Sequence, residues 1–406
     1  MTALREFRKY LEELGGLGSV AAGQEHTAIL RSRAPRALRE FVPLHKLRER
    51  GAFFTSNDMA EKLWAPALQG LGPSSVVVDP ACGAGDLLIP PLTRLLAERP
   101  DSVPRSIRGI DVERDFVRAA RTRLALLSGR STGEFSAIVT GDFLEDDISG
   151  TLALATHVVM NPPFSMVPSP PGSEWSSGAV SAAAVFVDKA LESMASGARL
   201  LAILPDVLRS GARYGRWRRS VRRRSNLVRL EDLGQFDELT DVHVFALELV
   251  REENPSWNAL SLEEARVSDA SRVGDFFDVR VGAVVPHRHA EVGPSLRFIT
   301  ARGLSSLPAD PPYRRFPGRA DRGPFVAVRR TSRPGERNRA KATLVDRDED
   351  MAVENHLIVL KQRDPAAFGY GDLLDVLRSG STTEFLDEVI RCRHLTVGAV
   401  RDVPWQ

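Results

Sequence analysis

The sequence predicts an α/β protein built around a doubly wound, mostly parallel sheet. From about residue 57 to 250, short apolar runs alternate with amphipathic segments, turn residues separate them, and their lengths suit strands and helices. Ligands of such sheets bind at the carboxyl ends of the strands, so functional residues should lie there. Strands are expected at residues 75–79, 107–111, 137–140, 157–160, 200–204, 227–233 and 243–250. Helices are expected at residues 59–68, 87–98, 116–128, 182–196 and 213–224.

A change of periodicity divides the chain. After residues 251–258 the sequence turns to short strands, glycines and prolines without regular alternation of strand and helix. The length of 406 residues also exceeds the usual size of one domain. We therefore predict a helical extension at residues 1–50, an α/β domain at 51–252 and a mixed α+β, β-rich domain at 253–406.

Composition indicates a soluble globular protein, with 43% hydrophobic and 27% charged residues. No apolar run has the length of a membrane span, and the N-terminus is charged, so we expect a cytoplasmic protein that does not contact membranes. Two cysteines, Cys82 and Cys392, are too few for a disulfide framework or a cysteine zinc site. We therefore expect no metal.

Positive charge is concentrated locally, although the formal net charge is only +2. Residues 209–229 contain nine arginines and no acidic residue, interleaved with Tyr214 and Trp217. Such a segment suits contacts with phosphate groups, and the alternative is a solvated helix face. The candidate phosphate contacts are Arg213, Arg216, Arg218, Arg219, Arg222 and Arg223.

Acidic residues follow three successive strands. Asp79 precedes a turn that contains Gly83 and Gly85, where the backbone can approach a ligand closely. Asp111 ends the next strand and can accept ribose hydroxyls. Asp142 can accept an adenine amino group beside Phe143, an aromatic residue that can stack on the ring. One such acid alone would be read as a strand end or helix cap, but three in register describe an adenosine site.

The fourth strand ends in the string Asn161-Pro162-Pro163-Phe164. The prolines restrict the backbone and lack N–H donors, so the Asn161 side-chain oxygen and the Pro162 carbonyl can both face a pocket as acceptors. An amino group attached to a planar ring is a poor nucleophile. Two acceptors that hold its hydrogens can aim the lone pair at an electrophile through orientation and electrostatics.

These strings, in this order, resemble the γ-type amino-methyltransferases of DNA, the TaqI-like group, over about residues 51–250. The resemblance implies a Rossmann-like fold and S-adenosylmethionine as the methyl donor. It also identifies Gly51-Ala52-Phe53-Phe54-Thr55 as a cofactor entry motif. The cofactor-binding residues that it implies are Phe53, Thr55, Asp79, Ala81, Cys82, Gly83, Gly85, Asp111, Val112, Asp142, Phe143 and Pro163.

The same resemblance implies the catalytic residues. Asn161, Pro162, Pro163 and Phe164 match the family's motif of Asn-Pro-Pro and an aromatic residue, with phenylalanine where the family favours tyrosine. Phe236 matches a second aromatic that packs against the extruded base, although it could equally fill the core. Pro90 and Pro91 depart from the pattern and should shorten or kink the helix at 87–98.

The C-terminal region resembles the target-recognition half of TaqI-like enzymes less specifically. Residues 314–341 carry ten basic residues against Asp321 and Glu336. Within this segment Arg329 and Arg330 are candidates for contacts with DNA bases or phosphates.

The expected function is therefore methylation of adenine N6 in double-stranded DNA, at a base that is flipped out of the duplex. The setting implied is a restriction-modification or related phage-defence system, with a cognate nuclease or defence-complex subunits as possible partners. The alternatives are methylation of protein glutamine or RNA, or a partner-dependent DNA-binding subunit of a defence complex. Methylation of cytosine N4 is a close variant, in which serine more often stands at the position of Asn161.

Overall fold

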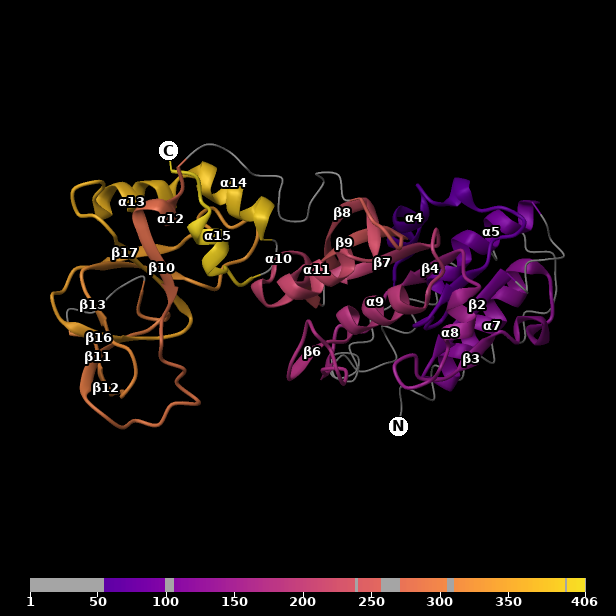
Figure 1. Cartoon of the computed structure of the whole chain (residues 1–406), viewed down its shortest axis with the longest axis horizontal. Coiled ribbons are helices and arrows are strands. Elements are labelled where there is room, and N and C mark those ends of the chain that lie inside the picture. The colour runs from indigo at the N-terminus through magenta and orange to yellow at the C-terminus, as the bar shows by residue number, and fades with distance from the viewer. Residues whose placement is uncertain are drawn as a thin grey trace. The chain divides into compact units, whose positions relative to one another are not determined.

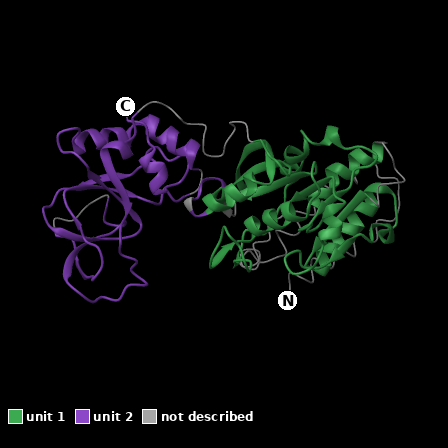
Figure 2. Ribbon diagram, viewed as in Figure 1, with its two compact units in different colours: residues 1–208, 214–261 green, residues 209–213, 262–406 purple. Residues whose placement is uncertain are grey.

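The computed structural model describes residues 55–98, 106–237, 240–256, 271–304, 310–390 and 393–405. The chain divides into two compact units, Met1–Leu208 with Tyr214–Ser261 and Arg209–Arg213 with Leu262–Gln406 (Figure 2). The predicted helical extension at residues 1–50, and Phe53 of the entry motif, lie outside the described residues. The predicted domain limits at residues 50 and 252 stay predictions.

The first unit contains a seven-stranded sheet in the order β3-β2-β1-β4-β7-β9-β8 (Figure 1). Neighbouring strands from β3 to β7 are parallel, and β9 runs antiparallel to both β7 and β8. The doubly wound, mostly parallel sheet predicted from the sequence is confirmed. Its strands are β1 (Val77–Asp79), β2 (Ile107–Asp111), β3 (Ile138–Thr140), β4 (His157–Met160), β7 (Arg199–Pro205), β8 (Ser225–Asp237) and β9 (Thr240–Arg251).

Helices cover both faces of this sheet, because alternate strand residues enter two different cores. Val77 and Val159 pack in one core with residues of α4, α5 and α7. Val78 and Val158 pack in the other core with residues of α8, α9 and α11. The helices are α4 (Asn57–Trp64), α5 (Ile89–Glu98), α7 (Arg114–Ser128), α8 (Ser149–Ala153), α9 (Ala182–Ser193), α10 (Val207–Ser210) and α11 (Gly215–Arg222), and the short 3-10 segments are η1 (Leu68–Gly70), η2 (Asp86–Leu88), η4 (Thr132–Phe135) and η5 (Ala212–Tyr214).

The two prolines after the glycine turn act at the start of a helix. The segment that was expected to be helical from residue 87 begins as η2, and α5 begins only at Ile89. Pro90 and Pro91 therefore occupy the first turn, where backbone N–H groups have no intrahelical acceptor. The predicted shortening of the helix is confirmed.

The second unit is β-rich, as predicted, and contains two four-stranded sheets in the orders β10-β17-β14-β15 and β12-β11-β16-β13. Apolar residues of α13, α14 and α15 pack with β10, β14 and β17 in one core. The strands are β10 (Phe277–Val281), β11 (Ser295–Ile299), β12 (Tyr313–Arg315), β13 (Asp321–Arg322), β14 (Phe325–Arg329), β15 (Ala342–Val345), β16 (Asp350–Val353) and β17 (Leu357–Gln362). The helices are α12 (Val273–Phe276), α13 (Tyr370–Arg378), α14 (Gly380–Val389) and α15 (Val397–Arg401).

Among the described residues of both units, no helix combines the length and the apolar character that crossing a bilayer requires.

Candidate active site

The turn after β1 depends on its glycines. Gly83 and Gly85 have φ angles of 48° and 87°, in the left-handed region that other residues rarely adopt. The Gly85 N–H donates to the Cys82 carbonyl at 2.8 Å, which closes the turn. A Cβ at Gly85 would lie 3.2 Å from the Cβ of Ala120 in α7, so the helix also packs closely here. The turn thus presents bare backbone at the carboxyl end of β1.

Asp79 and Asp111 meet at this turn. Asp111 Oδ2 accepts a hydrogen bond from the Gly83 N–H at 2.8 Å, and Oδ1 accepts one from the Glu113 N–H at 2.9 Å. Asp79 is buried, and its Oδ1 accepts from the Ala81 N–H at 3.0 Å. Burial raises the pKa of Asp111 to about 6 and raises the pKa of Asp79 well above its usual value. Backbone N–H groups of the glycine turn thus hold both carboxylates at the carboxyl ends of β1 and β2.

Cys82 lies beneath the turn. Its backbone N–H donates to the Ile110 carbonyl at 2.9 Å, and its side chain is buried. Burial raises the pKa of its thiol, and the nearby Asp79 and Asp111 raise it further, so the side chain is a neutral thiol. A Cβ at Gly109 of β2 would lie 3.0 Å from the Cys82 sulfur. Cys82 thus packs the turn against β2. The preceding residue, Ala81, is half-buried.

Asp142 and Phe143 follow β3, but they differ in accessibility. Asp142 is half-buried, and its Oδ1 accepts from the Leu144 N–H at 2.8 Å. Phe143 is only 1% exposed, and its ring centroid lies 4.7 Å from that of Phe186 in α9. A ring packed in this way does not fit the predicted stacking of Phe143 on an adenine. Val112 is 59% exposed beside Asp111 and presents apolar surface instead.

The structure brings Thr55, the last residue of the entry motif, into contact with the Asn-Pro-Pro-Phe motif. Asn161, directly after β4, donates from Nδ2 to the Thr55 hydroxyl at 3.0 Å, and Thr55 is buried. This contact joins residues 106 positions apart in the sequence. Since β4 lies beside β1, Asn161 leaves the same edge of the sheet as the glycine turn. The hydrogen bond orients the amide, with Oδ1 on the side of Cγ away from Thr55.

Two aromatic residues meet beside Asn161. The rings of Phe164 and Phe236 lie 5.8 Å apart at 83°, an edge-to-face contact. Phe236 comes from β8 and is 5% exposed, while Phe164 is half-buried and packs against both cores of the unit. Pro162 is buried and Pro163 half-buried. The catalytic residues inferred from the sequence therefore form one cluster.

The arginine segment 209–229 does not form a single charged face. Arg218 is 5% exposed and donates to the Leu208 carbonyl at 3.1 Å, which does not fit its prediction as a DNA contact. Arg229 pairs with Glu231 at 2.9 Å and with the buried Glu248 at 3.6 Å. Arg224 forms an ion pair with Asp188 of α9. The exposed members of the run are Arg213, Arg216, Arg219 and Arg223.

Sequence reasoning missed the acidic partners of this segment, because they lie elsewhere in the chain. Glu174 lies 3.7 Å from Arg223 and precedes α9, while Arg222 and Arg223 line a surface hollow that also includes Glu253. Asp188 did carry a signal. It follows the apolar run 182–187 of a helix, and a carboxylate there needs a partner.

The two arginine candidates of the second unit are hydrogen-bonded within that unit. Arg329 donates to the Ala301 carbonyl at 2.8 Å and Arg330 to the Asn355 carbonyl at 2.9 Å. Both side chains are half-buried, and burial lowers the pKa of Arg330. Their contacts fix both guanidinium groups, and their proposed approach to DNA stays a prediction.

The sheet order defines a doubly wound α/β protein, with the glycine turn, Asp111 and Asn161 at the carboxyl ends of its parallel strands. Residues 37–219 match the family described as N-6 DNA Methylase. Over 144 residues the chain is 28% identical to the Type II restriction enzyme and methyltransferase RM.BcgI of Heyndrickxia coagulans. That match covers 34% of this chain but only 21% of the relative's length.

Among solved structures, the chain resembles the Type IIL restriction-modification enzyme MmeI, determined in complex with DNA, with a TM-score of 0.57. The sequence identity is 13%, and the match covers 91% of this chain and 70% of that chain, so the likeness concerns the fold. The family match covers residues 37–219, less than half of the chain, and does not distinguish the γ type. The amino-methyltransferase resemblance is confirmed at that level.

Proposed function

We propose that this chain is a site-specific DNA methyltransferase of the γ type that transfers a methyl group from S-adenosylmethionine to adenine N6. The observation that carries the proposal is the cluster at the end of β4, where Asn161 is held by Thr55 beside the Phe164 and Phe236 rings. The family match at residues 37–219 supports the chemistry. The relatives' names support a restriction-modification or phage-defence setting, with a nuclease or further subunits as partners.

The residues around the glycine turn fit S-adenosylmethionine. Gly83 and Gly85 keep side chains out of the turn, and Asp111 is held there by the Gly83 N–H. Asp111 would take the ribose hydroxyls, and the exposed Val112 would pack against the adenine of the cofactor. Thr55 and Asp79 would border the methionine end. When bound, the cofactor supplies an electrophilic methyl group on its sulfonium.

Asn161 and Pro162 would hold the substrate amine. The Thr55 hydroxyl accepts from Nδ2 of Asn161, so Oδ1 is the part of the amide that can accept a hydrogen from the adenine amino group. The Pro162 carbonyl would accept the second hydrogen. Together these acceptors draw the nitrogen lone pair out of conjugation and orient it, without a strong base. Phe164 would stack on the base, and Phe236 supports Phe164 through their edge-to-face contact.

The exposed arginines would bind the duplex while the adenine is extruded. Unstacking a base costs a few kcal/mol, which contacts to the phosphates can offset. The candidates are the exposed Arg213, Arg216, Arg219 and Arg223 and the half-buried Arg222 of the first segment, with the half-buried Arg329 and Arg330 of the second unit as further candidates.

A methyl-transfer assay with labelled cofactor tests the proposal. Purified protein is incubated with duplex DNA, RNA and a protein extract in separate reactions, and the modified base is identified by mass spectrometry after digestion. We expect label in DNA as N6-methyladenine. Label only in RNA or protein would support the alternative substrates and contradict the proposal, and label as N4-methylcytosine would contradict the choice of adenine.

The partner-dependent alternative requires a second arm of this assay. Adenine methylation is mapped in cells that express this chain alone, against cells that also express genes adjacent to it in its genome. Methylation by the chain alone is expected. Methylation that appears only with the added proteins would identify a modification subunit that needs partners.

A further inference from the structure

The segment that follows the Asn-Pro-Pro-Phe motif forms a closed hairpin. Strands β5 (Met166–Pro168) and β6 (Ala179–Ser181) pair antiparallel, and the Ala182 N–H donates to the Ser165 carbonyl at 2.9 Å. At the other end, the Ser169 N–H donates to the Gly178 carbonyl at 2.7 Å. We call residues 165–181 the motif hairpin. Because it begins directly after Phe164, its position sets where the motif can lie.

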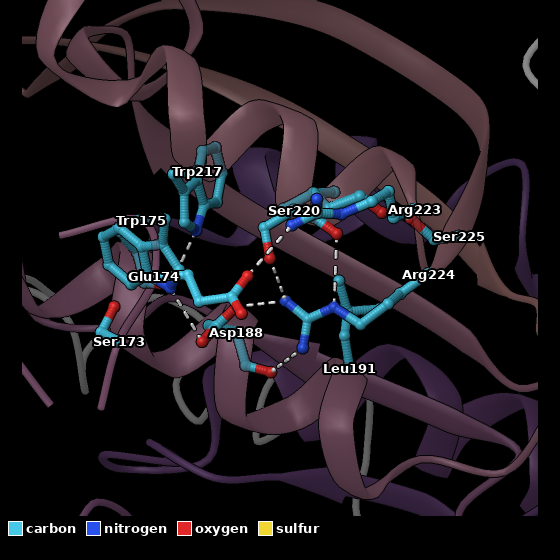
Figure 3. Close-up of polar contacts among 12 residues, drawn as sticks. Ser173, Glu174, Trp175, Asp188, Leu191, Trp217, Ser220, Arg223, Arg224 and Ser225 are labelled. Atoms are coloured by element: carbon cyan, nitrogen blue, oxygen red, sulfur yellow. Dashed lines mark hydrogen bonds and ion pairs between the residues drawn. The ribbon is translucent and has the colours of Figure 1, made fainter. Parts of the chain in front are cut away.

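Helix α11 holds the motif hairpin at both ends of the helix. Tyr214, which precedes α11, is buried, and its hydroxyl accepts a hydrogen bond from the Ser181 N–H at 3.0 Å. Arg224, which follows α11, reaches the hairpin through Asp188 of α9 (Figure 3). The arginine-bearing helix is therefore tied to both the base and the tip of the hairpin.

Asp188 is the connection at the tip. Its Oδ2 accepts from Trp175 Nε1 in the hairpin at 3.0 Å, and its Oδ1 accepts from Arg224 (Figure 3). Arg224 also donates to Ser220 Oγ at 3.0 Å and to the Asp188 carbonyl at 3.3 Å, which fixes the guanidinium. Trp175 is 8% exposed and packs in the core with α9 and α11. The Asp188 carboxylate therefore joins the hairpin to the residue that follows α11. Both hydrogen bonds are charge-assisted and so stronger than bonds between neutral groups.

The exposed side of α11 bears arginines, whereas Trp217 anchors its buried side to α9. Arg216 and Arg219 are exposed, while Trp217 is buried and donates from Nε1 to the Ala184 carbonyl of α9 at 3.0 Å. Exposed Arg223 lies 3.7 Å from Glu174, the residue before Trp175, so a second contact joins the helix end to the hairpin tip. A phosphate group bound by Arg216 and Arg219 would contact α11, and α11 is bonded to the motif hairpin.

We propose that Asp188 is a positioning residue that links the DNA-facing helix α11 to the motif hairpin, so that DNA binding at α11 places Phe164 for methyl transfer. This inference rests on the proposed function. It assigns Asp188, Trp175 and Arg224 a part in the reaction although none of them touches the reacting atoms.

The test compares two tryptophan variants. Trp175→Phe removes the N–H that bonds Asp188 and keeps an aromatic ring in the core. Trp217→Phe is the control, because it removes an indole N–H bond between α11 and α9 and leaves the bond between Trp175 and Asp188 in place. Single-turnover methyl transfer, DNA affinity and cofactor affinity are measured for both. Trp175→Phe is expected to lower the transfer rate about tenfold, with both affinities within twofold of the parent, which corresponds to one charge-assisted hydrogen bond.

Asp188→Asn provides the second variant. The amide oxygen can still accept from Trp175, but the charge that pairs with Arg224 is lost, so the rate should fall with DNA affinity retained. Equal loss of rate in Trp175→Phe and Trp217→Phe would show a general packing effect and overturn the proposal. Loss of DNA affinity that accounts for the whole loss of rate would also overturn it.

A hydrogen-exchange measurement separates this inference from the proposed function. Exchange at residues 165–181 is followed with and without duplex DNA. We expect DNA to protect the hairpin in the parent and in Trp217→Phe, but not in Trp175→Phe. If the parent transfers no methyl to DNA, the proposed function fails while this comparison still decides the link. Equal protection in all three proteins would overturn the link.

Discussion

The strand-end site and the arginine segment 209–229 respond differently to folding. At the strand ends, residues predicted from separate motifs meet: Asp111 accepts from the Gly83 N–H, and Asn161 donates to Thr55. In the arginine segment, residues that look alike in the sequence separate. Arg216 is exposed, Arg218 is buried, and Arg224 pairs with Asp188. Neighbouring parallel strands end at one edge of a sheet, whereas a helix directs consecutive residues to different sides.

Motifs at strand ends can be assigned to a site from the sequence, whereas charged residues on a helix cannot. A motif at the end of a parallel strand has its place determined by the sheet. For charged residues on a helix, the sequence gives only their spacing along the chain. Their ion-pair partners are distant residues such as Asp188 and Glu248.

The largest effect is expected at the strand ends. Asn161→Ala removes the amide that would hold the adenine amino group, so methyl transfer should fall by about a thousandfold or more. Cofactor affinity should change little, because Asp79 and Asp111 are unaltered. Labelled-methyl transfer and calorimetric cofactor titration check the two parts. Substantial turnover by this variant would remove Asn161 from the catalytic residues.

The arginine segment should divide into two classes. Arg216→Ala combined with Arg219→Ala removes two exposed charges and should lower the slope of log affinity against log salt by about 2. Arg218→Ala should leave that slope unchanged and lower the melting temperature instead, because the buried side chain bonds the Leu208 carbonyl. Anisotropy titrations of a labelled duplex over a salt series, with thermal unfolding, make the comparison. Equal slopes for the parent, the double variant and Arg218→Ala would show that the exposed arginines face solvent and do not contact DNA phosphates.

Cofactor binding should depend on pH through Asp111. Burial raises the pKa of this carboxyl to about 6, and the ionised form is the better acceptor for ribose hydroxyls. Affinity should therefore weaken as pH falls through about 6, by several-fold between pH 7 and pH 5. Asp111→Asn should bind more weakly and lose this dependence. Calorimetric titration at several pH values checks it, and an unchanged pH profile in the variant would assign the dependence to another group.

The smallest effect concerns the stability of the sheet in acid. Burial, with the nearby Arg199, lowers the pKa of His157 to about 4. The unfolded chain binds a proton near pH 6.5 and the folded chain does not, so His157 reduces stability as pH falls from about 6.5 to 4. Asp111 has the opposite sign, because its folded pKa exceeds its unfolded value and stability is gained as pH falls through about 6.

A His157→Gln variant separates these opposed contributions. The free energy of unfolding of the variant minus that of the parent should increase as the pH is lowered from 6.5 to 4.5. The increase should reach up to about 1.4 kcal/mol per pH unit, the value for one proton. Urea unfolding at pH 4.5, 5.5 and 6.5 measures the difference. Parallel stability curves would mean that His157 titrates alike in the folded and unfolded chains.

The sheet, and the edge of it at which the site lies, could be predicted from the amino-acid sequence. Alternation of apolar runs with helical segments is a local property, and the bounds of β2 and β4 agree with the predicted strands. The glycine turn could be predicted because Gly83 and Gly85 adopt positive φ angles that few other residues tolerate. The β-rich character of the second unit was also visible in its turns and short strands.

The contacts between side chains could not be predicted in this way, because they depend on how the elements pack. Phe143 follows its strand as predicted, yet its ring packs on Phe186 because the helix that covers the sheet lies there. The contact between Asn161 and Thr55 joins separate elements, and the pairing of Arg224 with Asp188 depends on how α11 lies on α9. Strand ends follow from local periodicity, whereas burial and ion pairing follow from packing between residues far apart in the sequence.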